Sequence, residues 1–272
     1  MNTALFFQGE KSKARFFKVL LLWVLVHSMS FTFAQKMDSM ATQQAVGRFS
    51  TGASVTNNGV SLIPSFSLGK PAAIFDLSLG KKRLSFEPQF RFALSGKPWS
   101  FLFWWRYKLL KANKFTFNVG AHPAIVFRER TYNTLNGEPV TVTIEQQNLA
   151  AEFVPTYELS KNVSVGAYYL VSHGFDKGGT RSINFFALRS SFSRISLSKQ
   201  LYFSIIPQVY YLRMDGKGGF YVNSTVVLGK NKFPLTVSSI LSKTIQTDLT
   251  GAKDFIWNIS LNYSFNKNYI GI

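Results

Sequence analysis

Few side chains in this sequence have types and spacing that could support catalysis. The chain has 272 residues, no cysteine and three histidines, which excludes thiolate nucleophiles and thiolate metal ligands. The stretch YLVSHGFDKGG places His173 next to Ser172, and Asn184 follows further along the chain. A serine hydroxyl becomes a nucleophile only where a base contacts it. The spacing between these side chains therefore decides whether they form a catalytic group.

This stretch resembles the outer-membrane phospholipase family only in part. The resemblance would require a His and a Ser two residues apart on one strand, with an Asn on the next strand. Here the second residue after His173 is Phe175, and Ser172 points to the opposite face of a strand. We therefore expect no catalytic residue and no enzymatic activity, and interpret His173 as a membrane-interface residue. A lipid hydrolase is kept as a minor alternative.

Other catalytic and cofactor-binding patterns are also absent from the sequence. No Gly-rich phosphate loop leads from a strand into a helix, and the Gly-rich stretches 174–179 and 214–219 are typical of hairpin tips. His122 is interpreted as a hydrogen-bonded residue, with a pH-sensitive gate or ligand contact as its functional alternative. We expect neither a metal nor a cofactor.

The formal net charge of +18 indicates an anionic partner: a nucleic acid, an anionic lipid or an anionic solute. The N-terminus helps to decide among these three. The apolar run VLLLWVLV at 19–26 follows a basic region, and Thr32-Phe33-Ala34 has the small-x-small form of a cleavage site. The basic region consists of Lys11, Lys13, Arg15 and Lys18. We predict a signal peptide over 1–34 with cleavage after Ala34; the alternative is a single transmembrane helix. Export makes nucleic acid an improbable partner.

The segments beyond the signal peptide must position any functional side chain, and from about residue 59 they alternate like β-strands. In FIWNISLNYSF (255–265), apolar side chains occupy the odd positions and polar ones most even positions, so the strand has one apolar and one polar face. Twelve such segments are predicted: 59–68, 73–80, 83–94, 99–110, 115–130, 140–159, 163–174, 181–197, 201–213, 219–229, 234–249 and 255–265. An even number is the rule in bacterial single-chain barrels, whose termini both lie in the periplasm.

These segments resemble the bacterial outer-membrane β-barrel class, over about residues 59–266. The resemblance implies an all-β, antiparallel transmembrane barrel of about twelve strands, forming a single domain at 59–272 in the cell outer membrane. The range 35–58 is predicted to be a periplasmic segment or a plug, with an extra strand as a further alternative. A soluble β-sandwich or lipocalin-like barrel would have to bury long aromatic rows such as the one at 99–107.

The alternation assigns side chains to the two faces of the barrel. Aromatic residues predicted to face lipid are Trp99, Phe101, Phe103, Trp105, Tyr107, Phe255, Trp257, Tyr263 and Phe265. A charge facing lipid near the midplane costs roughly 2–4 kcal/mol, so charged residues on the other face should line the lumen. These are Asp76, Arg83, Glu87, Arg91, Arg106, Lys108, His122, Arg128 and Glu152.

We expect a small porin-like channel with a basic lumen, or a barrel of structural role. A scaffold or binding barrel in an envelope complex is the alternative, with unknown protein partners. Membrane lipids are the expected partners, and small anionic solutes are candidates for the lumen. The short turns 80–82, 111–114, 160–162, 198–200 and 229–232 all carry lysine, so anionic headgroups could also bind at the rim.

Overall fold

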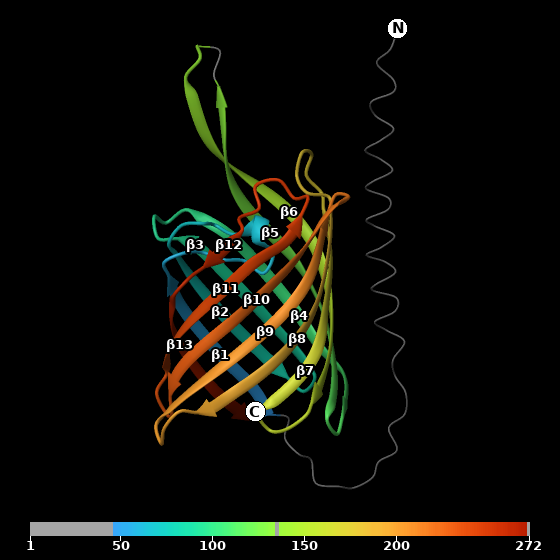
Figure 1. Ribbon diagram of the computed structural model, residues 1–272, viewed down its shortest axis with the longest axis vertical. Coiled ribbons are helices and arrows are strands. Elements are labelled where there is room, and N and C mark those ends of the chain that lie inside the picture. The colour runs from blue at the N-terminus through green and yellow to red at the C-terminus, as the bar shows by residue number, and fades with distance from the viewer. Residues whose placement is uncertain (1–45, 134–135, 271–272) are drawn as a thin grey trace. The chain divides into compact units, whose positions relative to one another are not determined.

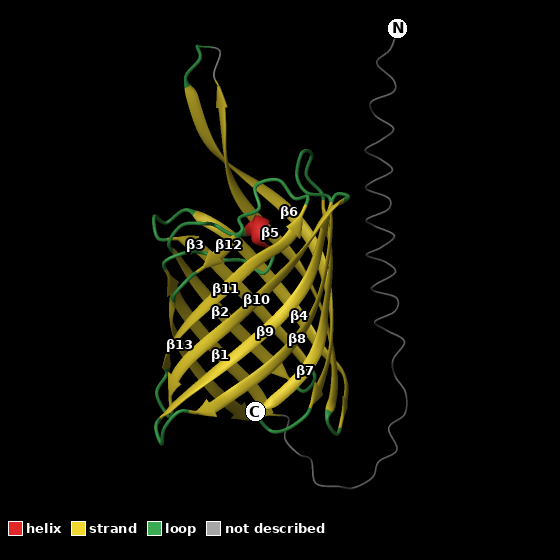
Figure 2. Cartoon of the chain, viewed as in Figure 1, coloured by secondary structure: helices red, strands yellow, loops and turns green. Residues whose placement is uncertain are grey.

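The computed structural model describes residues 46–133 and 136–270, which form one closed antiparallel barrel (Figure 1, Figure 2). Sequence neighbours pair from β1 to β12, and β13 pairs with β11 and with β1 to close the ring. The strands are β1 Val46–Thr56, β2 Ala72–Lys81, β3 Leu84–Ala93, β4 Pro98–Ala112, β5 Phe115–Asn133, β6 Pro139–Glu158, β7 Val163–Gly174, β8 Ser182–Ser196, β9 Leu201–Met214, β10 Lys217–Lys230, β11 Leu235–Thr247, β12 Phe255–Trp257 and β13 Ser260–Ile270. The predicted signal peptide and its cleavage site at Ala34 lie outside the described residues.

The short β12 and β13 are two parts of one membrane-crossing strand, so the barrel has twelve. Both pair with β11 in the same register, as Leu241 lies opposite Trp257 and Ser238 opposite Ser260. The ladder is interrupted at 258–259, where the Asn258 side chain accepts a hydrogen bond from the amide of Ile240 at 2.8 Å. The predicted antiparallel barrel of twelve strands is confirmed.

The position of the first strand differs from the expectation. The barrel begins with β1 at Val46, within the range predicted to lie before the barrel, and the extra-strand alternative is the one observed. The segment 59–68 is not a strand but part of the loop from β1 to β2, with the 3-10 helix η1 at Pro64–Phe66. Small outward residues such as Ala53 weaken the alternation in β1, which explains why its sequence pattern is faint.

The two ends of the barrel differ in the length of their connections. Both described chain ends, in β1 and β13, lie at the end with short turns (Figure 1). In outer-membrane barrels short turns face the periplasm and longer loops face outward. At the opposite end β5 and β6 extend as a hairpin beyond their neighbours, in one unbroken register. The sequence of 140–159 changes phase, with apolar residues at even positions up to Ile144 and at odd positions from Leu149, because the strand end rises above the barrel and not because of a bulge.

The outer surface carries an apolar band. In the last strand, outward-facing Phe255, Trp257, Tyr263 and Phe265 are each at least 40% exposed, as are Trp105 and Tyr107 on β4. Phe101 and Phe103 also lie on this face, where Phe101 contacts Phe90 and Phe127. Such a surface is stable only against lipid, so the chain is a β-barrel of the bacterial outer membrane. No helix in the described part of the chain is long and apolar enough to cross a bilayer.

Trp99 was predicted to face lipid, and this prediction is wrong. Its side chain is 2% exposed and lies inside the barrel. The cause is a shift of register between β3 and β4: Arg91 pairs with Ser100 but Phe92 pairs with Pro98, leaving Trp99 as the extra residue. A bulge of this kind reverses the alternation locally, so Trp99 turns inward while the rest of the row faces outward.

The interior has two unlike halves. On the periplasmic side the inward positions are small or polar, including Ser50, Ser85, Thr116 and Asn262. On the extracellular side the walls of β6 to β10 carry a buried apolar cluster that includes Leu170, Phe185, Tyr210, Leu212 and Tyr221. Ile63 of the β1–β2 loop belongs to this cluster, and Phe66 packs against it. The outer half of the lumen is therefore filled by a core of its own.

Candidate functional site in the lumen

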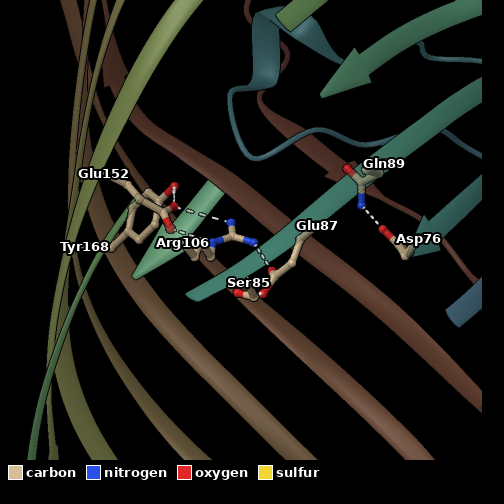
Figure 3. Close-up of polar contacts among 7 residues, drawn as sticks. All are labelled: Asp76, Ser85, Glu87, Gln89, Arg106, Glu152 and Tyr168. Carbon is tan, nitrogen blue, oxygen red and sulfur yellow. Dashed lines mark hydrogen bonds and ion pairs between the residues drawn. The ribbon is translucent and has the colours of Figure 1, made fainter. Parts of the chain in front are cut away.

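Arg106 on β4 is the centre of an ion-pair network on the luminal wall, from β3 to β7 (Figure 3). Its Nε lies 2.6 Å from Glu152 Oε1 on β6, and its Nη1 binds Glu87 on β3. The hydroxyl of Tyr168 donates to Glu152 Oε2 at 2.8 Å, and Ser85 donates to Glu87 at 2.7 Å. Because two carboxylates surround one guanidinium, the positive charge of Arg106 is compensated.

A second polar group on β2 and β3 ends in a cation that is less well compensated. Gln89 donates to Asp76, as Figure 3 shows, and accepts a hydrogen bond from Arg91 Nε at 2.6 Å. Arg91 also lies over the ring of Trp99, 5.0 Å from its centroid. Among the described residues Arg91 forms no ion pair, and its terminal nitrogens make no hydrogen bond. Arg91 is thus available to an anion in the lumen.

His122 on β5 packs inside the lumen against Trp104. The two ring centroids are 3.8 Å apart, and His122 Nδ1 lies 3.3 Å from the carbonyl oxygen of Pro123. Arg106 lies on the same tryptophan, 4.3 Å from its ring centroid. Trp104 therefore joins the apolar wall to the charged network, a role that the alternating pattern of its strand did not highlight.

The β1–β2 loop enters the barrel from the extracellular end and is held by the wall. Trp99 donates from Nε1 to the carbonyl oxygen of Phe66 at 2.8 Å. The guanidinium of Arg128 lies over the Phe66 ring, 4.8 Å from its centroid, and its Nη2 is buried without a hydrogen-bond partner among the residues that the structure describes. We call the loop 57–71 the plug loop, because it closes the extracellular side of the lumen.

Beneath the plug loop lies a cavity of about 370 Å³. Ile63, Leu102, Trp104 and Leu170 form an apolar part of its lining, and Arg91, Arg106 and Asp76 are among its charged groups. Ser50 and Ser78, from the periplasmic halves of β1 and β2, also line it. A site with one available cation beside an apolar wall suits a small anion that carries an apolar group.

Most of the residues predicted to line the lumen come together there. Asp76, Glu87, Arg91, Arg106 and His122 line the cavity. Glu152 is 2% exposed within the network, and Arg128 lies at the plug loop. Arg83 and Lys108 differ, because both lie near the periplasmic end and are exposed. Arg83 lies in the turn after β2 and donates to the carbonyl oxygen of Leu109 at 3.5 Å, so it belongs to the rim rather than to the lumen.

An ion-pair cluster fastens the plug loop at the extracellular mouth. Glu129 lies 2.9 Å from Lys70 Nζ of the plug loop and 2.5 Å from Lys97 Nζ of the β3–β4 loop. It lies on β5 above the last residue paired with β4. Hydrogen bonds from Lys97 and Lys70 lower the pKa of Glu129 to about 2.

Several residues of this site were missed from sequence. Tyr168 has inward parity and could have been found from the alternation of its strand. Ile63 and Phe66 could not, because their loop alternates like a strand. His173 lies against Phe175, with ring centroids 5.3 Å apart, and Asn184 accepts a hydrogen bond from Tyr169 at 2.8 Å. In the described part of the chain no three His, Asp or Glu side chains form a group that could hold a metal ion.

Comparison with known proteins gives likenesses of fold. No protein-family model matches the chain, and no curated protein matches it. Similar solved structures include the KdgM porin in complex with disordered oligogalacturonate, at 9% identity and a TM-score of 0.48, covering 80% of this chain and 99% of that one. An outer membrane channel from Pseudomonas putida F1 has 14% identity and a TM-score of 0.43, covering 86% and 100%. The beta domain of the Bordetella autotransporter BrkA has 11% identity and a TM-score of 0.42, covering 81% and 99%.

Proposed function

We propose that this outer-membrane barrel is a narrow, gated channel for small anions that carry an apolar group. The observation that carries this proposal is the cavity beneath the plug loop, where Arg91 presents a guanidinium that has no ion pair among the described residues, beside an apolar wall. A filled structural barrel would have no need for a buried cation without an ion pair, since burying an unpaired charge is costly. Passage would require the plug loop to move.

The charges along the lumen support a preference for anions. Arg106 is paired directly with Glu87 and Glu152, whereas Arg91 is connected to Asp76 only through Gln89. Arg128 lies further toward the extracellular mouth. A solute crossing the barrel would thus meet two arginines in sequence, and its apolar group would contact Leu102, Trp104 and Leu170.

The test is conductance in planar bilayers under a salt gradient, comparing the wild type with Arg91→Gln. The reversal potential of the wild type should favour anions, and Arg91→Gln should move it toward zero. The control is Lys177→Gln, which removes one positive charge from the exposed β7–β8 loop outside the lumen. This variant should leave the reversal potential unchanged. An identical reversal potential for wild type and Arg91→Gln would remove this arginine from the pathway.

A second candidate is a closed barrel of structural or scaffold role, since the plug loop joins a buried apolar cluster. Trp99→Phe, which loosens the plug loop, separates the two functions. A channel should conduct more often in this variant. A barrel that is correctly inserted but silent in both forms would favour the scaffold. Neither the channel nor the scaffold function, as proposed here, includes an enzymatic activity.

A further inference from the structure

Every strand that runs toward the periplasmic end arrives there through the same short pattern: an apolar residue, any residue, and a lysine. The pattern occurs at the end of all six, within the strand in four cases and in the turn that follows β6 and β8 in the other two. The pairs are Leu79 and Lys81, Leu109 and Lys111, Leu159 and Lys161, Leu197 and Lys199, Leu228 and Lys230, and Phe265 and Lys267. They are spread around the barrel, since the six strands alternate with those of opposite direction. The six lysines thus form a ring, here called the lysine ring.

The apolar member of each pair belongs to the surface that meets lipid. Its exposed fraction lies between 40% and 57% in all six cases. Residues two apart on a strand share a face, so Lys81, Lys230 and Lys267 continue the lipid-facing rows by one step. Lys161 and Lys199 lie in the turns after β6 and β8. Lys111, near the end of β4, lies opposite the inward-facing Thr116, because a shift of register at Leu109 changes its face. All six are exposed, and none forms an ion pair with another described residue.

The extracellular end is different. The pattern occurs at the end of only two of the six strands that run toward it, at Phe175 and Lys177 and at Leu241 and Lys243. A third instance there, Leu68 and Lys70, lies in the plug loop, and its lysine is paired with Glu129. Acidic side chains such as Glu129, Asp176 and Asp215 lie among the lysines at that end. At the periplasmic end Glu158 is the one acidic residue among those described. The charge is therefore polarised along the barrel axis.

We propose that the lysine ring binds the phosphate headgroups of anionic phospholipids in the periplasmic leaflet. A lysine two residues beyond a lipid-facing side chain can lay its methylene stem along the apolar surface and place its ammonium among the headgroups. Each cation near an anionic membrane surface strengthens binding by about fivefold. Because the six lysines have no ion pair among the described residues, their ammonium groups are free to attract lipid phosphates. This inference is independent of whether the lumen conducts.

The experiment uses the mature protein in nanodiscs that contain equal amounts of phosphatidylglycerol and phosphatidylcholine. Native mass spectrometry then gives the ratio of the two lipids that remain bound. The wild type should retain phosphatidylglycerol several-fold over phosphatidylcholine, and replacing all six ring lysines with glutamine should bring the ratio close to one. Replacing them with arginine should preserve the preference. The matched control is the triple variant Lys177→Gln, Lys243→Gln and Lys253→Gln at the other end, which should behave as wild type.

Three outcomes would overturn the proposal: equal retention of both lipids by the wild type, unchanged preference after loss of the ring, or an equal fall in the extracellular control. If the sixfold glutamine variant does not fold, Lys81→Gln, Lys161→Gln and Lys230→Gln together still decide, with about half of the preference expected to remain. Because exposed charges are screened, 1 M salt should also reduce the preference.

Discussion

The indole Nε1–H of Trp99 donates to the carbonyl oxygen of Phe66 at 2.8 Å, and this bond ties the wall of the barrel to the plug loop. Trp99 can do so only because the bulge in β4 turns it inward. The relationship joins a residue on a rigid strand to a loop that crosses the mouth, which is the arrangement expected of a gate.

Trp99→Phe should loosen the plug loop without unfolding the barrel. An aromatic ring is kept, but the hydrogen bond of about 1 kcal/mol and part of the buried indole packing are lost, so the closed state should weaken by roughly fivefold or more. The measurement is the open probability of single channels. Trp105→Phe, which changes an indole on the lipid-facing side, is the control and should have no effect. Equal open probabilities for wild type and Trp99→Phe would show that this bond does not hold the gate.

Glu152→Gln should destabilise the barrel by about 2–3 kcal/mol. The carboxylate is buried and binds both Arg106 and Tyr168, so its neutralisation weakens two hydrogen bonds and leaves Arg106 with Glu87 alone. Denaturant-induced unfolding in detergent measures the change. Glu158→Gln, at an exposed position near the periplasmic turns, should stay within about 0.5 kcal/mol of the wild type. Similar losses in both variants would mean that the Arg106 network contributes little.

The ion-pair cluster at the mouth should be insensitive to mild acid. The pKa of Glu129 is lowered from 4.5 to about 2, so its contribution to holding the plug loop is fully present above pH 4.5 and disappears as the pH falls through about 2. Open probability should therefore change little between pH 7 and pH 5. Glu129→Gln should show at pH 7 the increase in opening that the wild type shows only near pH 2. A wild type that opens already at pH 5 would contradict this assignment.

The barrel and most of its luminal charges could be predicted from sequence, because alternation with period two survives wherever strands pair in a continuous register. It placed Glu87, Arg106 and His122 correctly. It failed at Trp99, where one bulge reverses the faces, and at 59–68, where a loop has the polarity pattern of a strand. The site depends on that loop. Its insertion is a long-range packing event between the plug loop and strands far away in sequence, which no local pattern encodes.

Gly120 lies where the Arg106 network leaves no room for a side chain. A Cβ at this position would lie 2.9 Å from Glu152 Oε1, 3.0 Å from Glu152 Cγ and 3.1 Å from Arg106 Cγ. Gly120→Ala should therefore displace one partner of the ion pair and destabilise the barrel by about 1–3 kcal/mol, in spite of the better strand propensity of alanine. Denaturant-induced unfolding measures the loss. The luminal position of Gly52 is the matched control, since a Cβ there would meet only ordinary contacts at 3.5 Å and beyond. Gly52→Ala should be neutral or slightly stabilising. If both variants unfold at the same denaturant concentration as the wild type, the network can shift to accept a methyl group and its geometry is less constrained than the distances imply.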